Sequence, residues 1–495
     1  MLFNSLGYLL FLLAGVGIHW LLPHRLRVYF ICLASVTFYA MWRWEFSLLV
    51  VFSAVVDYVS AARIHAGARR GVRRAWLVTS LTVNLGLLVF FKYTYFIAEN
   101  VSALASRLGL GAIDPSGWGL KIILPLGISF YTFQTISYTI DVYRGVTRPT
   151  RHFPTFLAYV MFWPQLIAGP ILRAGEVIPL LAGTRRFGLD DLQAGFWRVL
   201  CGLFKKAVVA DGLARMVEYW FDQPIGALTA VDVWVAAVLF AFQIYCDFSG
   251  YSDIAIGSAR MLGIRFPDNF NWPYLAVSPR DFWRRWHISL SSWIRDYLYL
   301  PLTGRPFQTH STGGIAVAAE AGPRGLRRRD LALLGTWLIM GLWHGAAWKF
   351  VLWGGYHGLI VLLFRAIGPL DRLTQRVPVL GWALTTLIVM AGWIPFRAHS
   401  VAQATRMFAK LLSPGQYRLS EAVTGLSVRI AGYSYLWAFL LPLLTVILFG
   451  LWRTLRGRNL PAAVELPARV AIAGAMTVLI LLSMGAKEVF IYFQF

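Results

Sequence analysis

The sequence predicts an all-α polytopic integral membrane protein, with roughly eleven or twelve transmembrane or re-entrant helices around a central cavity. Three observations favour this class. Hydrophobic residues make up 58% of the 495 residues and charged residues only 14%. The mean hydropathy is +0.60. The apolar residues fall in runs long enough to cross a bilayer core, and short basic stretches separate the runs. This composition excludes an ordinary soluble enzyme.

The net charge of +23 comes from short clusters of Lys and Arg between the apolar runs. Cytoplasmic loops and anionic lipid headgroups explain this pattern better than nucleic acid, which we do not expect as a partner. Cys32, Cys201 and Cys246 lie in apolar surroundings without a CxxC motif. The sequence therefore predicts neither a disulfide framework nor a cysteine metal site.

The first helices are expected in pairs whose basic ends lie on the cytoplasmic side. Basic residues are concentrated at 63–74, after the predicted helix 46–62, and at 144–151, after the predicted helix 121–143. Both helices would therefore end on the cytoplasmic side. We read the first apolar run as a retained helix, because no cationic region precedes it and no small-residue cleavage site follows it. The predicted helices are 6–22, 28–41, 46–62, 75–91 and 121–143.

The segment 152–184 is apolar but is interrupted by four prolines. It is too long for one span and too short for two. Irregular backbone at membrane depth is tolerated where it is buried in protein or lines a cavity. We therefore predict that 162–173, FWPQLIAGPILR, with Gln165, forms a cavity wall. A merely kinked helix is the alternative.

The next predicted pair is 207–220 and 234–256, and its second helix carries Asp247, Ser249 and Asp253. Two carboxylates within an apolar span are costly unless they are paired, solvated or protonated. They could orient a histidine or an arginine by hydrogen bonding. Equally, they could be structural partners for arginines of the following segment.

A helix is predicted to begin after Ser278, because Ser278 suits the N-cap, Pro279 the first helical position and Asp281 the third. Basic and aromatic residues then gather around His287. If the helix is continuous, the residues that share a face with His287 are Arg280, Trp283, Arg284, Ser291 and Ile294. Arg285 and Trp286 lie to the side of that face. Such a helix could be an interfacial anchor. Alternatively, its arginines could bind the phosphates of an acyl-CoA or acyl-carrier donor.

The segment 335–358, GTWLIMGLWHGAAWKFVLWGGYHG, places Trp343 and His344 in an apolar, glycine-rich setting. A basic run precedes it, and His344 would stand about 22 Å along a helix from Arg329. We expect 341–345 to form the apex of a shallow hairpin, with His344 facing a cavity. A polar group at this depth is usually functional, although a structural histidine is the alternative. The glycines would allow close helix approach or a local break.

Beyond this hairpin the sequence predicts helices at 378–395, 433–451 and 467–484. We expect a single transmembrane domain over 1–495. Its parts are N-terminal helices at 1–120, a motif-bearing core at 121–360 and C-terminal helices at 361–495.

Five motifs in this order carry a resemblance to a known family. They are LPLGISFYTFQTISYTIDVYRG (124–145), FWPQLIAGPILR (162–173), IYCDFSGYSDIAIG (244–257), RDFWRRWHISLSSWIRDYLYLPL (280–302) and MGLWHGAAWKFVLWGGYHG (340–358). The chain resembles the membrane-bound O-acyltransferase family over most of its length. Within the family it is similar to the branch of bacterial inner-membrane proteins that serve alginate O-acetylation.

The resemblance implies a catalytic role for His344 as a base, with His287 as the second signature histidine. It also implies an acyl group taken from a cytoplasmic thioester, acetyl-CoA, without a metal. The acceptor would be a hydroxyl on a periplasmic acetyltransferase that belongs to an exopolysaccharide biosynthesis complex. The expected donor contacts are Arg280, Trp283, Arg284, Arg285 and Trp286. The expected orienting or cavity residues are Gln165, Asp247, Ser249, Asp253 and Trp343.

The chemistry of the residues is compatible with these roles, because a neutral imidazole can accept the proton of an attacking hydroxyl. Other functions remain open on the sequence. D-alanyl or another acyl transfer would use the same groups. A transporter or flippase would explain the proline-broken segment and the intramembrane carboxylates. A scaffold for a polysaccharide synthase would need neither histidine.

Overall fold

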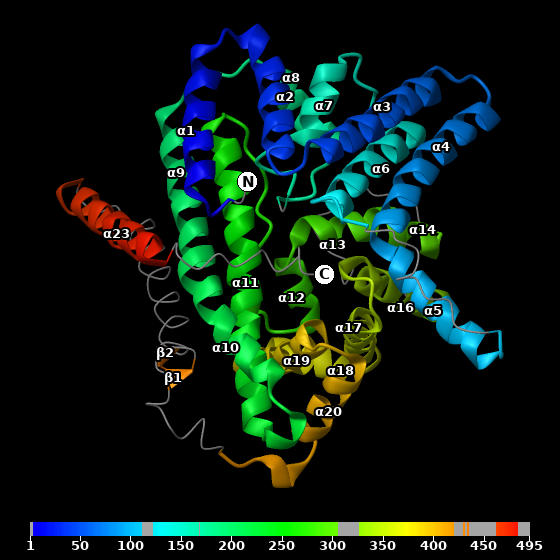
Figure 1. Ribbon diagram of the computed structural model, residues 1–495, viewed down its shortest axis with the longest axis vertical. Coiled ribbons are helices and arrows are strands. Elements are labelled where there is room, and N and C mark those ends of the chain that lie inside the picture. The colour runs from blue at the N-terminus through cyan, green and yellow to red at the C-terminus, as the bar shows by residue number, and fades with distance from the viewer. Residues whose placement is uncertain are drawn as a thin grey trace. The chain divides into compact units, whose positions relative to one another are not determined.

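The computed structural model describes residues 3–110, 122–167, 169–304, 326–419, 429–430, 433–434 and 462–483. Helices dominate these residues (Figure 1), and the two strands among them are dipeptides, β1 (Arg429–Ile430) and β2 (Tyr433–Ser434), which pair antiparallel. The chain divides into two compact units, described separately here. The first unit holds 1–195 and 255–267, and the second holds 196–254 and 268–495.

The first unit is built around three helices that pack on one another, α3, α4 and α6 (Figure 1). Local signals fix several helix ends; for example, Ser5 caps the first helix by accepting from the Tyr8 N–H. The helices are α1 (Leu6–Leu21), α2 (His24–Ala40), α3 (Trp44–Ala66), α4 (Arg70–Leu88), η1 (Val89–Tyr93), α5 (Thr94–Arg107), α6 (Ile128–Arg144), α7 (Phe153–Met161) and α8 (Ala174–Ala182). Two further helices, α9 (Leu189–Leu203) and α11 (Ala230–Met261), run from one unit into the other.

The second unit contains the long part of α11 and a hairpin of two helices, α16 and α17. Its further elements are η3 (Phe204–Ala210), α10 (Asp211–Asp222), η4 (Ile225–Ala227), η5 (Pro273–Leu275), α12 (Pro279–Arg285), α13 (Ile288–Ile294), η6 (Arg295–Tyr299), α14 (Leu300–Thr303), α16 (Leu326–His344), α17 (Trp348–Ala366), α18 (Gly368–Arg376), α19 (Pro378–Arg397), α20 (Val401–Leu411), η7 (Pro414–Gln416) and α23 (Ala462–Ser483).

Four described helical stretches are long and apolar enough to cross a membrane, namely 44–66, 70–107, 230–261 and 378–397. The helices α17 and α18 meet at a bend of 88°, and they add a fifth candidate if the two together form one span. The prediction of an all-α, multi-pass membrane protein is confirmed. The larger count of eleven or twelve includes shorter and re-entrant segments and stays a prediction, as does the division into three parts.

The predicted helix at 433–451 lies outside the described residues except for Tyr433 and Ser434, which form β2. The proline-rich segment is broken rather than merely kinked: α7 ends at Met161 and α8 begins at Ala174, and the described residues between them are not helical. That this segment forms a cavity wall stays a prediction. This irregular stretch is buried inside the first unit, with Gln165 only 2% exposed.

The helix predicted after Ser278 begins as expected, because the Ser278 hydroxyl accepts from the Asp281 N–H at 3.1 Å. Its predicted continuation through His287 is wrong. The helix α12 ends at Arg285, Trp286 is extended, and His287 is left-handed before α13 begins. The cause is a set of hydrogen bonds to residues 269–271, which hold the backbone on both sides of the break.

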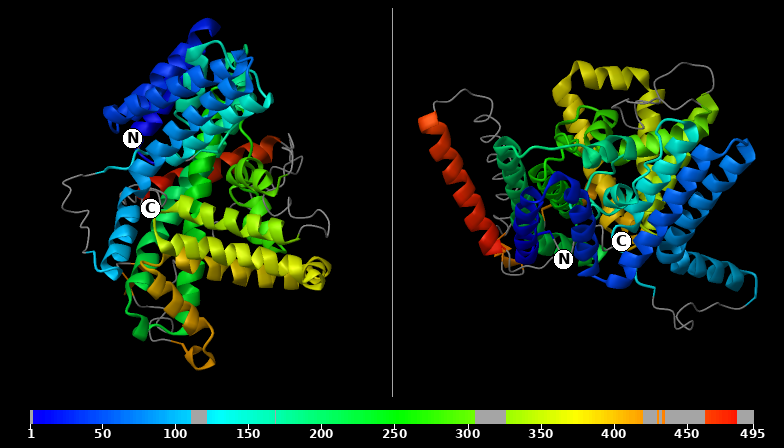
Figure 2. Two further views of the ribbon diagram at one scale, coloured as in Figure 1. Left: turned by 90° about the vertical axis from the view of Figure 1, so that its right-hand side faces the viewer. Right: turned by 90° about the horizontal axis from the view of Figure 1, so that it is seen from above.

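The glycine-rich hairpin is present, and its two helices lie side by side (Figure 2). Its turn lies at 345–347 rather than at the predicted 341–345, because Gly341 is helical. A Cβ at Gly341 would collide with the Phe350 carbonyl and lie 3.2 Å from the Gly354 Cα. A Cβ at Gly354 would collide with the Trp337 carbonyl. The predicted role of these glycines in close helix approach is confirmed.

The hairpin contact yields a stability prediction. Gly354→Ala is expected to lower the free energy of unfolding by about 1–3 kcal/mol, because the added methyl group must push two helix backbones apart. Thermal unfolding of the detergent-solubilised protein measures the effect. Gly335→Ala is the matched control on α16, because nothing lies within 4 Å of its added Cβ. Equal melting temperatures for the two variants would contradict the packing argument.

Candidate active site

The candidate site lies in the second unit, on a set of buried rings from α12, α16, α17 and α19. We call this set the aromatic cluster. Its ring centroids are joined by successive separations of 4.7–6.3 Å, as offset or edge-on aromatic pairs prefer. Its members are Trp283, Trp286, Trp337, Trp353, Trp393 and Phe396.

His344 is the last residue of α16, directly before the turn of the hairpin. Its side chain is buried, with 5% exposed. The imidazole lies 4.9 Å from the rings of Trp343 and Trp353 and 5.5 Å from Phe396, measured between centroids. The close contact of the two hairpin helices therefore places this imidazole against aromatic faces, away from bulk water.

His357 on α17 is a second histidine of the same region as His344. The two histidines belong to different helices, so a single helical wheel does not relate them. The Trp353 ring lies 4.9 Å from His344 and 5.1 Å from His357. The close approach of Gly392 leaves no room for a side chain, because a Cβ there would lie 2.7 Å from the His357 Nε2. Within the described residues, this Nε2 has no hydrogen-bond partner.

His287 occupies the break between α12 and α13. Its φ is 43°, a left-handed conformation that costs a non-glycine residue of order 1–3 kcal/mol. The imidazole is 1% exposed and lies 4.5 Å from the Phe248 ring and 6.4 Å from the Phe270 ring. Such a conformation persists only where surrounding contacts fix it.

The preceding loop supplies the contacts that fix His287. The Asn271 N–H donates to the Arg285 carbonyl at 2.9 Å, and the Ile288 N–H donates to the Asn269 carbonyl at 2.9 Å. These bonds divert the backbone on each side of His287 from a continuous helical ladder. They explain why the helical prediction failed here.

The Asn269 side chain strengthens the same junction. Its oxygen accepts from the Ser289 N–H at 3.2 Å and from the Ser289 hydroxyl at 2.8 Å, and its amide donates to the Ser252 hydroxyl of α11 at 3.2 Å. Asn269 therefore ties the His287 junction to α11. The sequence analysis did not single it out, because an asparagine in a loop carries no signal of a distant partner.

A series of indoles joins the surroundings of His287 and His344. Trp286, next to His287, lies 4.9 Å from Trp393, and Trp393 lies 6.2 Å from Trp353, which contacts His344. His344 thus contacts the aromatic cluster directly, whereas His287 reaches it through Phe270, whose ring lies 6.4 Å from His287 and 5.1 Å from Trp286. The sequence left open whether they come near each other.

The predicted donor-binding residues on α12 and directly after it divide into two groups. Trp283 and Trp286 are buried members of the aromatic cluster, whereas Arg284 is exposed. Arg285 pairs with Asp281 at 2.9 Å. The last arginine, Arg280, has its guanidinium 3.7 Å from the Asp371 carboxylate of α18.

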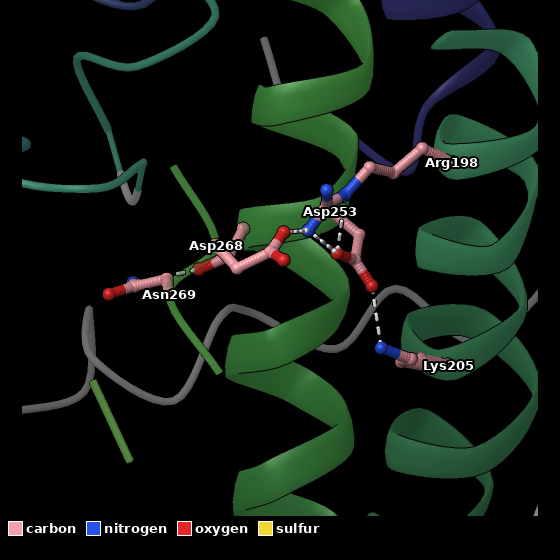
Figure 3. A network of polar contacts seen from close by, with 6 residues as sticks. Arg198, Lys205, Asp253, Asp268 and Asn269 are labelled. Carbon is pink, nitrogen blue, oxygen red and sulfur yellow. Dashed lines mark hydrogen bonds and ion pairs between the residues drawn. The ribbon is translucent and has the colours of Figure 1, made fainter. Parts of the chain in front are cut away.

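The two carboxylates of α11, Asp247 and Asp253, pair with cations of α9 and η3. Figure 3 shows the contacts of Asp253. Asp253 binds the Lys205 amine at 2.5 Å and Arg198 at 2.9 Å, and Arg198 also binds Asp268 at 2.5 Å. Asp268 directly precedes Asn269, so this network continues to the loop that fixes His287. Ser249, between the two carboxylates in sequence, is buried on α11.

Lys206 is a buried cation that contacts two carboxylates. Its amine lies 2.6 Å from Asp247 and 2.7 Å from Asp211, and all three side chains are at most 3% exposed. Opposite charges at these distances offset part of the desolvation cost of burial. The sequence analysis missed Lys205 and Lys206 because its predicted helix began at 207. The sequence did carry one signal for them, a pair of adjacent lysines in an apolar run. In the structure both lysines lie in the π-helical η3, and π-helical turns are often found at functional sites.

The remaining predicted site residue, Gln165, belongs to the first unit, where neither of its polar side-chain atoms has a hydrogen-bond partner among the described residues. Across the part of the chain that the structure describes, no group of three or more His, Cys, Asp or Glu side chains could hold a metal ion. The arrangement offers acid–base chemistry by imidazole in an apolar, water-poor setting.

Comparison with known proteins adds independent evidence. The family model described as MBOAT, membrane-bound O-acyltransferase family, matches residues 146–318. A probable alginate O-acetylase of Azotobacter vinelandii is 40% identical over 423 residues, which cover 85% of this chain and 80% of the relative. A peptidoglycan O-acetyltransferase of Helicobacter pylori is 35% identical over 404 residues, or 76% of this chain and 72% of the relative.

More distant similarity extends to a teichoic acid D-alanyltransferase of Bacillus subtilis, 26% identical over 279 residues that cover 54% of this chain and 66% of the relative. The names of these relatives all describe transfer of an acyl group. The 40% identity to the Azotobacter vinelandii relative covers 85% of this chain. Together with the family match and with apolar helices able to span a bilayer, it identifies the protein as a multi-pass acyltransferase that belongs to the membrane-bound O-acyltransferase family.

Proposed function

We propose that this enzyme moves an acetyl group from a cytoplasmic thioester, acetyl-CoA, to a hydroxyl at the periplasmic side of the bacterial inner membrane. There a periplasmic acetyltransferase, working with an exopolysaccharide biosynthesis complex, places the acetyl group on the polysaccharide, which we take to be alginate. The relatives named as probable alginate O-acetylases, which match most of this chain, support the polymer and the acyl group.

The observation that carries the proposal is the position of His344. It ends α16, whereas the basic residues that favour the cytoplasm lie at the start of that helix. The separation along α16 is about 22 Å from Arg329, most of the depth of a bilayer core. An acyl group delivered from the cytoplasm must therefore reach deep into the protein before it meets this imidazole.

In the proposed reaction, His344 takes the proton of the acceptor hydroxyl while the hydroxyl oxygen bonds to the thioester carbonyl carbon. The tetrahedral intermediate then collapses, the carbon–sulfur bond breaks, and the imidazolium returns the proton to the departing thiolate. His287 would donate a hydrogen bond to the charge that develops on the carbonyl oxygen. The loop contacts that fix its backbone support this role, because a donor held in advance needs no reorganisation during the reaction.

We assign the phosphates of the donor to Arg280, Arg284 and Arg285, since guanidinium groups bind phosphate oxygens well. The exposure of Arg284 supports access by a soluble cofactor. Trp283 and Trp286 are buried, and we therefore assign them to the acyl end of the donor. The carboxylates Asp247 and Asp253, with Ser249 and Trp343, would shape the path of the acyl group rather than take part in proton transfer. Gln165 stays a predicted cavity-wall residue of the first unit.

Replacing the proposed base should abolish transfer without unfolding the protein. His344→Ala, in proteoliposomes with acetyl-labelled acetyl-CoA and a candidate periplasmic acceptor, is expected to lower acceptor labelling and CoA release together by about 10²–10⁴-fold, the usual contribution of general acid–base catalysis. Scintillation counting of the acceptor and a thiol assay measure the two products.

His399→Ala is the matched control, because His399 is exposed and its pairing with Asp222 lies at the surface. It should leave both products unchanged. Normal labelling by correctly inserted His344→Ala would refute the assignment. Movement of substrate across the membrane without thioester cleavage would favour a transporter instead.

The donor assignment yields a separate kinetic prediction. Arg284→Gln is expected to raise KM for acetyl-CoA about tenfold with little change in kcat, because a lost charged hydrogen bond to phosphate weakens ground-state binding. Initial rates at varied acetyl-CoA concentration measure it. Arg372→Gln on α18 is the control for general loss of surface charge. An equal rise in KM for both variants would argue against a phosphate contact at Arg284.

A further inference from the structure

The first unit contains a buried polar cluster that includes none of the residues assigned above. It lies inside two of the candidate spans and joins three helices: Asp57 on α3, Ser80 and Asn84 on α4, and Thr135 and Thr139 on α6. Each side chain is at most 1% exposed. Asp57 lies about 20 Å along α3 from its first residue, near the middle of the span.

The Asn84 amide fixes the orientation of the cluster. Its nitrogen donates to the Ser80 carbonyl at 2.9 Å and to the two Asp57 carboxyl oxygens at 2.9 and 3.0 Å. Its oxygen accepts from the Ser53 hydroxyl at 2.7 Å and the Thr135 hydroxyl at 3.1 Å. A backbone carbonyl only accepts, so the amide cannot be turned the other way round.

Four oxygen atoms of the cluster lie in a row, and the hydrogen bonds between them determine how many protons the row must hold. The Asp57 Oδ1 lies 2.6 Å from the Ser80 hydroxyl, that hydroxyl lies 3.0 Å from the Thr139 hydroxyl, and Thr139 lies 3.1 Å from the Ile136 carbonyl. Three hydrogen bonds in a row need three protons. The two hydroxyl groups supply two, and the carbonyl at the end supplies none. When all three bonds are made, Ser80 donates its one proton to Thr139, and the third proton therefore comes from the Asp57 carboxyl.

The charges around the cluster support the same conclusion. The helices α2, α4, α6 and α7 pack on α3. Within the described residues, no cation from these helices forms an ion pair with Asp57, and Arg73 of α4 is engaged with the Tyr143 carbonyl. Tyr138 on α6 interacts electrostatically with Asp57 and with Tyr58 on α3, and Tyr159 on α7 interacts with Tyr138 and Asp141, so these titratable neighbours are neutral phenols or an acid. A bare carboxylate inside the bilayer without a cation would be very costly.

We propose that Asp57 is an intramembrane proton-binding site, held as a neutral acid that donates to Ser80 and accepts from Asn84. The ligand is a proton rather than a metal cation, because the Asn84 N–H group faces both carboxyl oxygens and would repel a cation there. This proposal is independent of the acetyl-transfer proposal, because none of its residues takes part in that chemistry.

Infrared spectroscopy of the full-length protein in lipid nanodiscs tests the site. With aspartate isotope-labelled at the side-chain carboxyl, the wild type at neutral pH should show a carboxylic-acid C=O band that shifts with the label. Asp57→Asn should lose this band and remain folded, because the amide of Asn also donates with one group and accepts with the other. Asp191→Asn is the matched control: Arg265 and Arg260 donate to Asp191 and hold its pKa below the ordinary value, so it contributes no acid band.

Ser80→Ala provides a second readout if Asp57→Asn fails to insert. It removes the acceptor of the acid proton, so the band should persist at a shifted frequency. The absence of an acid band in the wild type would overturn the proposal, and so would a band unaffected by Asp57→Asn and by Ser80→Ala. Loss of the wild-type band on addition of sodium chloride would also overturn it, by showing that a metal cation displaces the proton.

Discussion

The direct packing of Gly341 against Gly354 is the constraint on which the candidate active site depends. With hydrogen atoms in place of side chains, the backbones of α16 and α17 touch, and a turn of three residues suffices to join them. This spacing brings Trp337 and Trp353 into one aromatic cluster and leaves His344 at the end of its helix, against the rings of that cluster. A wider separation would open the cluster to lipid or water and release the imidazole from its fixed surroundings.

Burial of polar groups is handled differently in the two units. In the second unit, buried carboxylates of α11 meet cations, and Lys206 between Asp247 and Asp211 shows this at its most enclosed. In the first unit, Asp57 meets only neutral side chains among its described partners. Ion pairs with good geometry offset the removal of both charges from water, whereas hydrogen bonds from neutral groups alone leave the charge of a buried carboxylate without an opposite charge nearby.

Much of the architecture could be predicted from the sequence, because hydropathy and basic loops directly reflect the bilayer. The first helix was predicted at 6–22 and is found at Leu6–Leu21, and the cap at Ser278 was predicted from three residues. The motif resemblance indicated the family that 40% identity to a relative confirms. Local patterns of this kind need no knowledge of distant contacts.

The failures have the opposite origin. The break at His287 depends on hydrogen bonds from residues 269–271, which a helical wheel does not contain. The partners of Asp247 and Asp253 lie more than forty positions earlier in the chain, as Lys206, Lys205 and Arg198. The shared contact of His344 and His357 with Trp353 arises only after the hairpin closes. In each case a tertiary contact decided what the local pattern left open.

The adjacent lysines of η3 also have a mechanical consequence. Lys206 pairs with Asp247 and Lys205 with Asp253, and these carboxylates are about 9 Å apart along α11. Sliding of η3 along α11 by one helical turn would separate both pairs, and breaking a pair as buried as Lys206 and Asp247 costs about 3–5 kcal/mol. Shear between these two segments is thereby opposed, so they would move as one rigid body. An opening at other helix contacts would leave both pairs intact.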